Sequence, residues 1–223
     1  MLDAHETREP DDADATASGL AAFVDRVGGR LPSFGAALGE LRDLDHAVYA
    51  AVAETPTPTI DVPLRRLSSA ANYSRIWLSV AGALALFGGP RARRAALSGA
   101  AACGVTSAVV SLGIKPLGRA RPDRALHQVP AGRQVKMPTS SSFPSGHAAA
   151  GFAFASAVGT ELPVLTLPLG LMALTVAYSR VHTGVHYPYD TVIGATLGTA
   201  IGQAVAYSLH RHLFFRHTAH SAG

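Results

Sequence analysis

The sequence predicts an all-α membrane protein, a multi-pass bundle of about five transmembrane helices preceded by amphipathic helices. Only 15% of its 223 residues are charged, against roughly 25% in an average soluble domain. Three uncharged stretches each approach the ~20 residues needed to cross the hydrocarbon layer of a bilayer: residues 95–114, 162–179 and 191–209. The lipid bilayer is therefore the expected surrounding of the bundle.

A soluble helical bundle is the structural alternative. The apolar stretches are rich in Ala and Gly rather than Leu. Hydropathy alone therefore also fits Ala-rich helices buried inside a water-soluble protein.

Two segments precede the bundle. Residues 1–19 are acidic and polar, so we expect them to be disordered and to contain no cleavable signal peptide. Residues 20–73 are expected to form amphipathic helices that lie on the membrane surface or against the bundle. Within residues 33–53, apolar side chains recur at helical spacing: Leu38, Leu41, Leu44 and Val48.

Residues 74–209 are expected to form the membrane-embedded domain. Two shorter apolar stretches, residues 76–90 and 148–160, bring the number of helices to five. The last helix carries a glycine at every fourth position, a spacing that permits close helix packing in membranes: Gly194, Gly198 and Gly202. A basic tail, residues 210–223, follows.

The positive charge does not indicate a nucleic-acid-binding protein. The net charge is +4 and the isoelectric point is near 9.6, values that would suit nucleic acid. However, the cations cluster at the ends of apolar stretches, as in Arg91, Arg93 and Arg94, where membrane proteins carry them. We therefore expect a membrane lipid rather than nucleic acid as the partner; the sequence does not indicate an oligomeric state.

Alternating crossings of the bilayer bring three separate polar segments to one face. The second helix arrives there near Ile114, the third leaves near His147, the fourth returns at Arg180 and the fifth departs near Asp190. The opposite face holds only short turns. Random scatter of polar loop residues would populate both faces, so the convergence indicates a site.

The chemistry of these segments suits a phosphate group. Lys115, Arg121 and Arg180 are fixed cations, and Arg adds bidentate geometry toward an oxyanion. Ser145 and Gly146 open the third helix, where unpaired backbone N–H groups favour an anion. The neighbouring Ser140, Ser141 and Ser142 are expected to be ordinary loop residues.

Two histidines and a carboxylate complete the set. Asp190 follows His186 by four residues, close enough to bond one ring nitrogen and leave the other basic. His186 could then attack phosphorus, and His147 could protonate the departing oxygen. A metal site is the rival use of two His and an Asp, but the surrounding cations would repel a metal ion.

At this point the residues resemble the type 2 phosphatidic acid phosphatase family, whose active-site design is shared with vanadium haloperoxidases. The second family motif, Pro-Ser-Gly-His, is matched by residues 144–147, and the third by SRVHTGVHYPYD, residues 179–190. The first motif departs from the pattern, because five residues rather than six separate Lys115 from Arg121. Arg119 is therefore a second candidate for the role of Lys115.

The resemblance implies a haloperoxidase-like helical core and a role for each matched residue. His186 is the nucleophile, Asp190 orients it, and His147 is the general acid and base. The phosphate-binding residues are Lys115, Arg121, Ser145, Gly146 and Arg180. The family requires no metal, and no cofactor is expected.

The expected function is hydrolysis of a lipid phosphomonoester or pyrophosphate through a phosphohistidine. Phosphatidic acid, phosphatidylglycerol phosphate and polyprenyl phosphate or pyrophosphate are all open as substrates. The alternatives are a vanadate-dependent haloperoxidase, which halide oxidation by peroxide would reveal, and a non-catalytic membrane protein that binds phosphate or lipid. Lys and Arg outside the motifs occur on both faces, so the resemblance, not the charge rule, implies a cell-membrane protein with an extracytoplasmic site.

Overall fold

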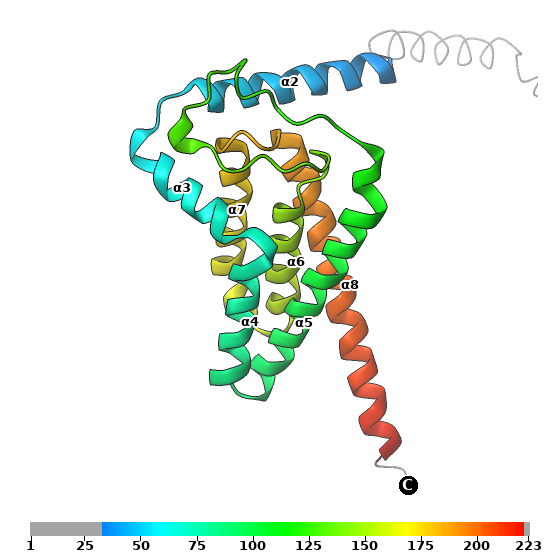
Figure 1. Ribbon diagram of the computed structural model, residues 1–223. Coiled ribbons are helices and arrows are strands. Elements are labelled where there is room, and N and C mark those ends of the chain that lie inside the picture. Colours follow the sequence, from blue (N-terminus) through cyan, green and yellow to red (C-terminus); the bar gives the residue numbers. More distant parts are fainter. Residues whose placement is uncertain (1–32, 221–223) are drawn as a thin grey trace, which may run out of the picture. The chain divides into compact units, whose positions relative to one another are not determined.

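The computed structural model describes residues 33–220, and this part of the chain is entirely helical and irregular, without strands (Figure 1). The all-α prediction is confirmed. The elements in chain order are α2 (Phe34–Glu54), α3 (Pro58–Ala70), η1 (Asn72–Ser74), α4 (Arg75–Phe87), α5 (Pro90–Ala108), the π-helical η2 (Val109–Ile114), η3 (Lys115–Leu117), η4 (Ala131–Arg133), α6 (Gly146–Glu161), η5 (Pro163–Leu165), α7 (Thr166–His182) and α8 (Pro188–His220).

The chain divides into two compact units, residues 1–44 and 45–223. The described part of the first unit is the beginning of α2, where the Ser33 hydroxyl accepts a hydrogen bond from the backbone N–H of Ala36 (3.2 Å). A serine at this position caps a helix, because it satisfies a donor that the first turn leaves free. The helix expected over residues 33–53 is confirmed, whereas the expectations for residues 1–19 and 20–32 lie outside the described residues.

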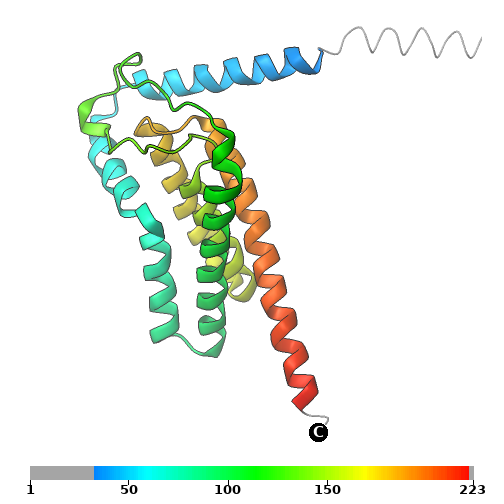
Figure 2. The ribbon, with the colours of Figure 1, turned by 45° about the vertical axis from the view of Figure 1, so that its right-hand side comes forward.

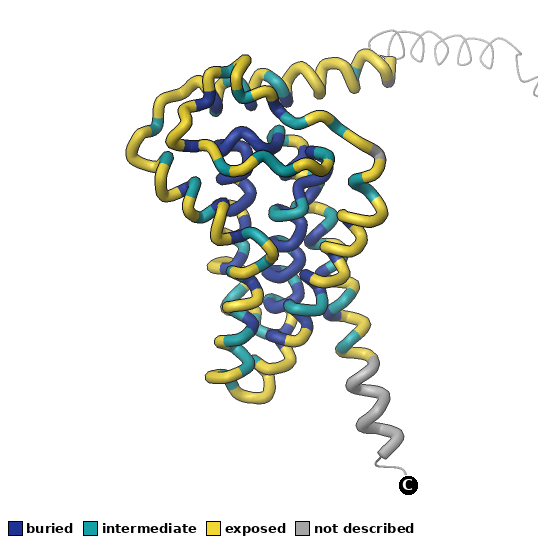
Figure 3. The backbone as a smooth tube through the Cα atoms, in the orientation of Figure 1, coloured by how far each residue is buried: buried dark blue, intermediate teal, exposed yellow. Residues whose placement is uncertain are grey.

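Helix α6 is the centre of the bundle in the second unit, and it packs against α5, α7 and α8 (Figure 2). Its residues are small, and Ala148, Ala149, Ala153 and Phe154 are fully buried. Figure 3 shows α6 as mostly buried along its length. A helix that is apolar all round is expected in a protein core or across a membrane, and α6 has helices packed around it.

The glycines of α8 lie directly against α6, as their four-residue spacing predicts. A Cβ atom added to Gly194 would lie 2.6 Å from the backbone oxygen of Ser145, and one on Gly198 would collide with the backbone of Ala149. The backbone N–H of Ser145 also donates to the backbone oxygen of Asp190 (2.9 Å). The close approach therefore fixes the start of α6 against the start of α8.

Three helices are long and apolar enough to cross a membrane: Pro90–Ile114, Pro163–His182 and Pro188–Arg211. Large apolar side chains on their outer faces are exposed, among them Leu112, Leu167 and Leu174. Such extensive apolar exposure is unfavourable in water and suits contact with lipid. Helices α4 and α6 have 13 and 16 residues, so the expected number of five spans stays a prediction.

The two ends of the bundle differ as expected. One end has short turns between α4 and α5 and between α6 and α7, whereas the other carries residues 115–145 and the loop before α8 (Figure 1). Buried Arg133 fastens the long segment to α3, because its Nε donates to Asp61 Oδ1 (2.8 Å). Asp61 also bonds Nε2 of His182 in α7 (3.1 Å). These bonds hold the long segment over the end of the bundle.

Candidate active site

His186 and Asp190 meet at the start of α8. His186 lies in the loop before the helix, and Asp190 lies in its first turn, with 3.5 Å between His186 Nδ1 and Asp190 Oδ2. The backbone N–H of Tyr187 donates to the same carboxylate oxygen (2.9 Å). Both side chains are buried, His186 being 2% and Asp190 0% exposed. The carboxylate is therefore held where it can orient Nδ1 and leave Nε2 for chemistry.

Burial lowers the pKa of His186 to about 4, and the positive charges of Arg180 and Arg121 contribute to the decrease, while the hydrogen bond to Asp190 opposes it. The imidazole is consequently neutral near pH 7. A neutral ring keeps a free lone pair, which a nucleophile needs.

The hydroxyl of Ser142 also contacts His186 and Asp190, and the sequence did not predict this contact. Its hydroxyl donates to Asp190 Oδ2 and lies 3.4 Å from His186 Nδ1. The side chain is fully buried. Ser142 lies two positions before the Pro-Ser-Gly-His motif, but nothing in its spacing shows that it meets residues more than forty positions away.

Arg121 approaches His186 from the side of Nε2. One guanidinium nitrogen donates to the backbone oxygen of Val185 (2.6 Å) and lies 3.4 Å from His186 Nε2. The other two nitrogens donate to the backbone oxygens of Ser140 (2.8 Å) and Ser141 (3.0 Å). Arg121 thus ties the long segment to the loop that carries His186.

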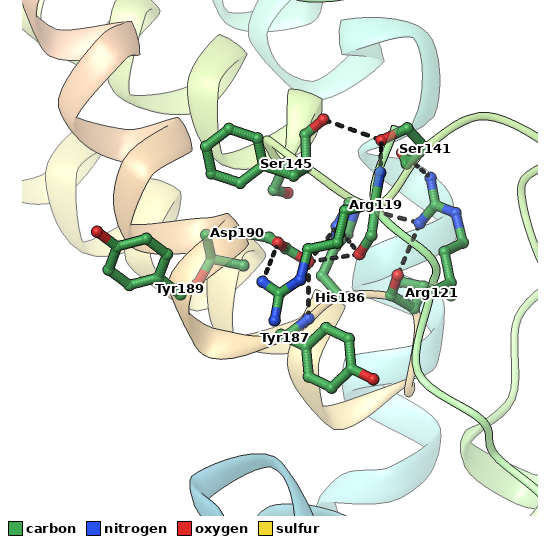
Figure 4. A network of polar contacts seen from close by, with 12 residues as sticks. Arg119, Arg121, Ser141, Ser145, His186, Tyr187, Tyr189 and Asp190 are labelled. Carbon is green, nitrogen blue, oxygen red and sulfur yellow. Dashed lines mark hydrogen bonds and ion pairs between the residues drawn. The ribbon is translucent and has the colours of Figure 1, made fainter. Parts of the chain in front are cut away.

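Arg119 has different partners from those expected. It donates to Asp190 Oδ1 (2.7 Å) and to Asp45 Oδ2 (2.6 Å), and it stacks on the ring of Tyr187 (4.3 Å to the centroid). Figure 4 shows its guanidinium directed at Asp190. Two carboxylates occupy this side chain, so the expectation that Arg119 shares phosphate binding with Lys115 is not supported; Arg119 anchors Asp190 instead.

A cavity of about 630 Å³ lies beside this cluster. Its lining includes four of the predicted residues: Lys115, Gly146, His147 and Arg180. Lys115 therefore reaches the cavity despite the shortened first motif. The other predicted residues, His186, Arg121, Ser145 and Asp190, are not in this lining.

The cations of the cavity have unused capacity for an anion. Arg180 donates to the Ser68 hydroxyl (2.6 Å) and to the Ser68 backbone oxygen (3.4 Å), but its buried Nε has no hydrogen-bond partner among the described residues. Burial, together with Arg121 and Arg180, lowers the pKa of Lys115. A buried donor without a partner is costly, and an oxyanion in the cavity would supply the acceptor.

Ser145 is the N-cap of α6, and His147 lies in the first turn of this helix. The Ser145 hydroxyl accepts a bond from the backbone N–H of Ala148 (3.5 Å) and so caps the helix. His147 Nε2 is bonded to Asn72 Oδ1 (2.9 Å). Asn72 also lines the cavity. It precedes two residues with left-handed backbone, Tyr73 (φ 56°) and Ser74 (φ 57°). No sequence motif indicated that Asn72 belongs to the site.

Among the described residues, no group of three or more His, Cys, Asp and Glu side chains has the arrangement of a metal site.

Comparisons with known proteins identify relatives of this chain. The sequence pattern of the PAP2 superfamily matches residues 92–214. The decaprenylphosphoryl-5-phosphoribose phosphatase of Mycobacterium tuberculosis is 37% identical over 147 residues, which cover 63% of this chain and 76% of the relative. The undecaprenyl-diphosphatase of Sulfolobus acidocaldarius is 41% identical over 70 residues, 29% of this chain and 32% of the relative.

Solved structures share the fold. The PAP2 type phosphatidylglycerolphosphate phosphatase of Bacillus subtilis, a transmembrane protein, superposes with a TM-score of 0.60 at 18% identity, over 78% of this chain and 87% of the other. At this identity the likeness concerns the fold.

Proposed function

Because this chain belongs to the PAP2 superfamily, we propose that it is a membrane phosphatase that releases phosphate from a polyprenyl-linked lipid. The observation that carries the proposal is the buried His186–Asp190 pair, 3.5 Å apart, beside a cation-lined cavity at the end of apolar helices. The curated relatives act on polyprenyl-linked phosphates by name. Decaprenylphosphoryl-5-phosphoribose and polyprenyl pyrophosphate are therefore the first substrates to consider.

The chemistry proceeds in two displacements. His186 Nε2 attacks phosphorus, the bond from phosphorus to the leaving oxygen breaks, and His147 gives that oxygen a proton. Water then attacks the phosphohistidine, His147 accepts a proton from it, and inorganic phosphate leaves with His186 free again. Arg121 has to move from its position 3.4 Å from Nε2 before the phosphoryl group can arrive there.

The remaining residues hold the charge of the transferring phosphoryl group. Lys115, Arg121 and Arg180 face its oxygens together with the Ser145 hydroxyl and the backbone N–H of Gly146. Donors fixed in advance cost no reorganisation during the reaction, and they supply much of the rate enhancement in such sites. The unpartnered Nε of Arg180 supports this assignment.

A substrate comparison tests the proposed function. We expect the purified protein in detergent to release phosphate from polyprenyl pyrophosphate and polyprenyl phosphate, and to do so equally with EDTA, because fixed cations rather than a metal hold the phosphate. Phosphatidic acid, with its two acyl chains, is the comparison lipid. Activity that disappears with EDTA and returns with a divalent metal would contradict the mechanism.

We infer that Ser142 is a positioning residue for the Asp190 carboxylate. Its bond to Asp190 helps to fix the carboxylate that orients His186. We expect Ser142→Ala to lower kcat by about 10- to 100-fold, since a hydrogen bond to a charged group contributes about 1.5–3 kcal/mol.

The split between kinetic constants separates positioning from folding in this variant. KM should change little, because Ser142 is not in the lining of the cavity. Ser208→Ala is the matched control: its exposed hydroxyl bonds only the backbone of its own helix, at Ala204. An unchanged kcat in Ser142→Ala would show that Asp190 needs no help from this serine.

We propose further that the site faces the extracytoplasmic side of the cell membrane, as the family resemblance implies. A cysteine introduced at exposed Ser140 should react with an impermeant reagent in intact cells, whereas one at Ser208 should not. The reverse labelling would contradict this orientation.

A further inference from the structure

A second cavity, of about 450 Å³, adjoins the one at the active site. Its lining consists of Arg65, Arg66, Ser69, Gln134, Val135 and Lys136. Three of these residues, Ser69, Val135 and Lys136, also line the active-site cavity. The two cavities therefore share a wall built from α3 and from the segment that follows η4.

The second cavity carries positive charge without compensating acid. Arg65, Arg66 and Lys136 form no ion pair with any described residue, because the salt bridges of this part of the structure involve other cations. The acid of α3, Asp61, is bonded to Arg133 and His182. Three cations that line one cavity without a carboxylate favour an anion, and arginines suit a phosphate in particular.

The arginines of the second cavity lie along α3 from the wall that the two cavities share. Arg65 precedes Ser69 by one helical turn, about 6 Å along α3 at 1.5 Å per residue, and Ser69 lies at the wall that both cavities share. An anion held by Arg65 and Arg66 would lie in the second cavity, and a phosphate beside Lys115 and His147 would lie in the active-site cavity. Two anionic groups in these two cavities are expected to belong to one substrate when a spacer joins them.

The active-site cavity offers hydroxyl groups to such a spacer. Ser69, Ser107, Ser111 and Thr139 line it, and none of the hydrogen bonds found among the described residues involves their hydroxyls. Ser107 and Ser111 lie one helical turn apart on α5 and η2. Free hydroxyls that face a polar cavity suit a sugar or another polyol, because each can both donate and accept a hydrogen bond.

We propose that Arg65, Arg66 and Lys136 bind a second phosphate of the substrate. The substrate class is then a lipid whose terminal phosphomonoester is separated by a pentose or a similar polyol from a phosphodiester that leads to the lipid chain. This inference rests on the proposed function and narrows it. The active-site cations hold the phosphate that leaves, and the second cavity holds the phosphate that stays.

The test compares three substrates in the double variant Arg65→Ala/Arg66→Ala. The substrates are a polyprenylphosphoryl pentose with a terminal phosphate, a polyprenyl monophosphate and a polyprenyl pyrophosphate, each in neutral detergent. We expect kcat/KM for the first substrate to fall by about 10- to 100-fold, mainly through KM, since charge-assisted bonds to phosphate are the strong ones. We expect the other two substrates to change by less than about 2-fold, and Lys136→Ala to show the same pattern more weakly.

A matched control removes the same charge elsewhere. Arg93→Ala/Arg94→Ala deletes two exposed arginines from the first turns of α5, at the opposite end of the bundle, and should leave all three activities unchanged. Equal losses for all three substrates in Arg65→Ala/Arg66→Ala would mean that the arginines attract any anionic lipid, and would overturn the subsite. If kcat/KM changed for none of the three substrates, the subsite would be overturned as well. If kcat/KM fell as much with the pyrophosphate as with the pentose substrate, the requirement for a spacer between the two phosphates would be overturned. A wild-type protein that hydrolyses no substrate would instead overturn the proposed function.

Discussion

His186→Ala is expected to reduce phosphate release by roughly 10³-fold or more, because the reaction loses its nucleophile. The cavity cations and His147 remain in this variant. They can bind the substrate and stabilise charge, but they provide no atom in line to accept the phosphoryl group. Release of phosphate from the polyprenyl substrates in detergent measures the effect.

Folding has to be separated from chemistry in this experiment. His186 is only 2% exposed, and truncating a buried side chain to alanine costs stability through the cavity it leaves. His186→Gln fills more of the space and also lacks the imidazole, so it should be as inactive as the alanine variant while unfolding closer to the wild-type temperature. His210→Ala, at an exposed position in α8, is the control and should retain full activity.

The covalent intermediate gives a second readout. We expect wild-type protein quenched in alkali during turnover of ³²P-labelled substrate to carry acid-labile label, and the His186 variants to carry none. His147→Ala should retain label for longer than the wild type, because hydrolysis of the phosphohistidine loses its base. Phosphate release at the wild-type rate by His186→Ala would rule out the proposed mechanism.

The third motif could be predicted from the sequence because its main contact is local. His186 and Asp190 are only four residues apart, one in the loop before α8 and the other in its first turn, so their approach is local in sequence. The three long apolar stretches likewise predicted α5, α7 and α8, because length and the absence of charge suffice to identify such helices. Periodicity in α8 predicted the glycine face that packs on α6.

The contacts that support these residues could not be predicted in the same way. Ser142 bonds Asp190 across 48 positions, and His147 meets Asn72 across 75. The path of residues 115–145 and the turn between α3 and α4 bring these residues together. Neither segment has a repeating sequence pattern from which its path could be predicted. Arg119 illustrates the consequence. Its charge and spacing suggested a phosphate ligand, yet its guanidinium donates a hydrogen bond to Asp45, 74 positions away.

Asp190→Asn is expected to reduce kcat by about 10³- to 10⁴-fold, since the corresponding change in a serine-protease triad costs about 10⁴. In the wild type, one carboxylate oxygen faces His186 Nδ1, the Ser142 hydroxyl and the Tyr187 N–H, and the other faces Arg119. An amide can present an oxygen to only one of these sides. If the NH₂ group faces His186, the ring carries its proton on Nε2 and has no lone pair there for phosphorus.

Asp45→Asn distinguishes this electronic effect from a loss of structure. Asp45 is the other carboxylate on Arg119 (2.6 Å), and it also accepts the backbone N–H of Tyr189 (2.7 Å), but it does not contact His186. We expect this variant to unfold at a lower temperature while keeping kcat within about 10-fold of the wild type, because breaking one partner of a buried pair acts first on stability. Equal losses of kcat in the two variants would assign the effect to Arg119 and the loop it holds, whereas a selective loss in Asp190→Asn assigns it to the orientation of His186.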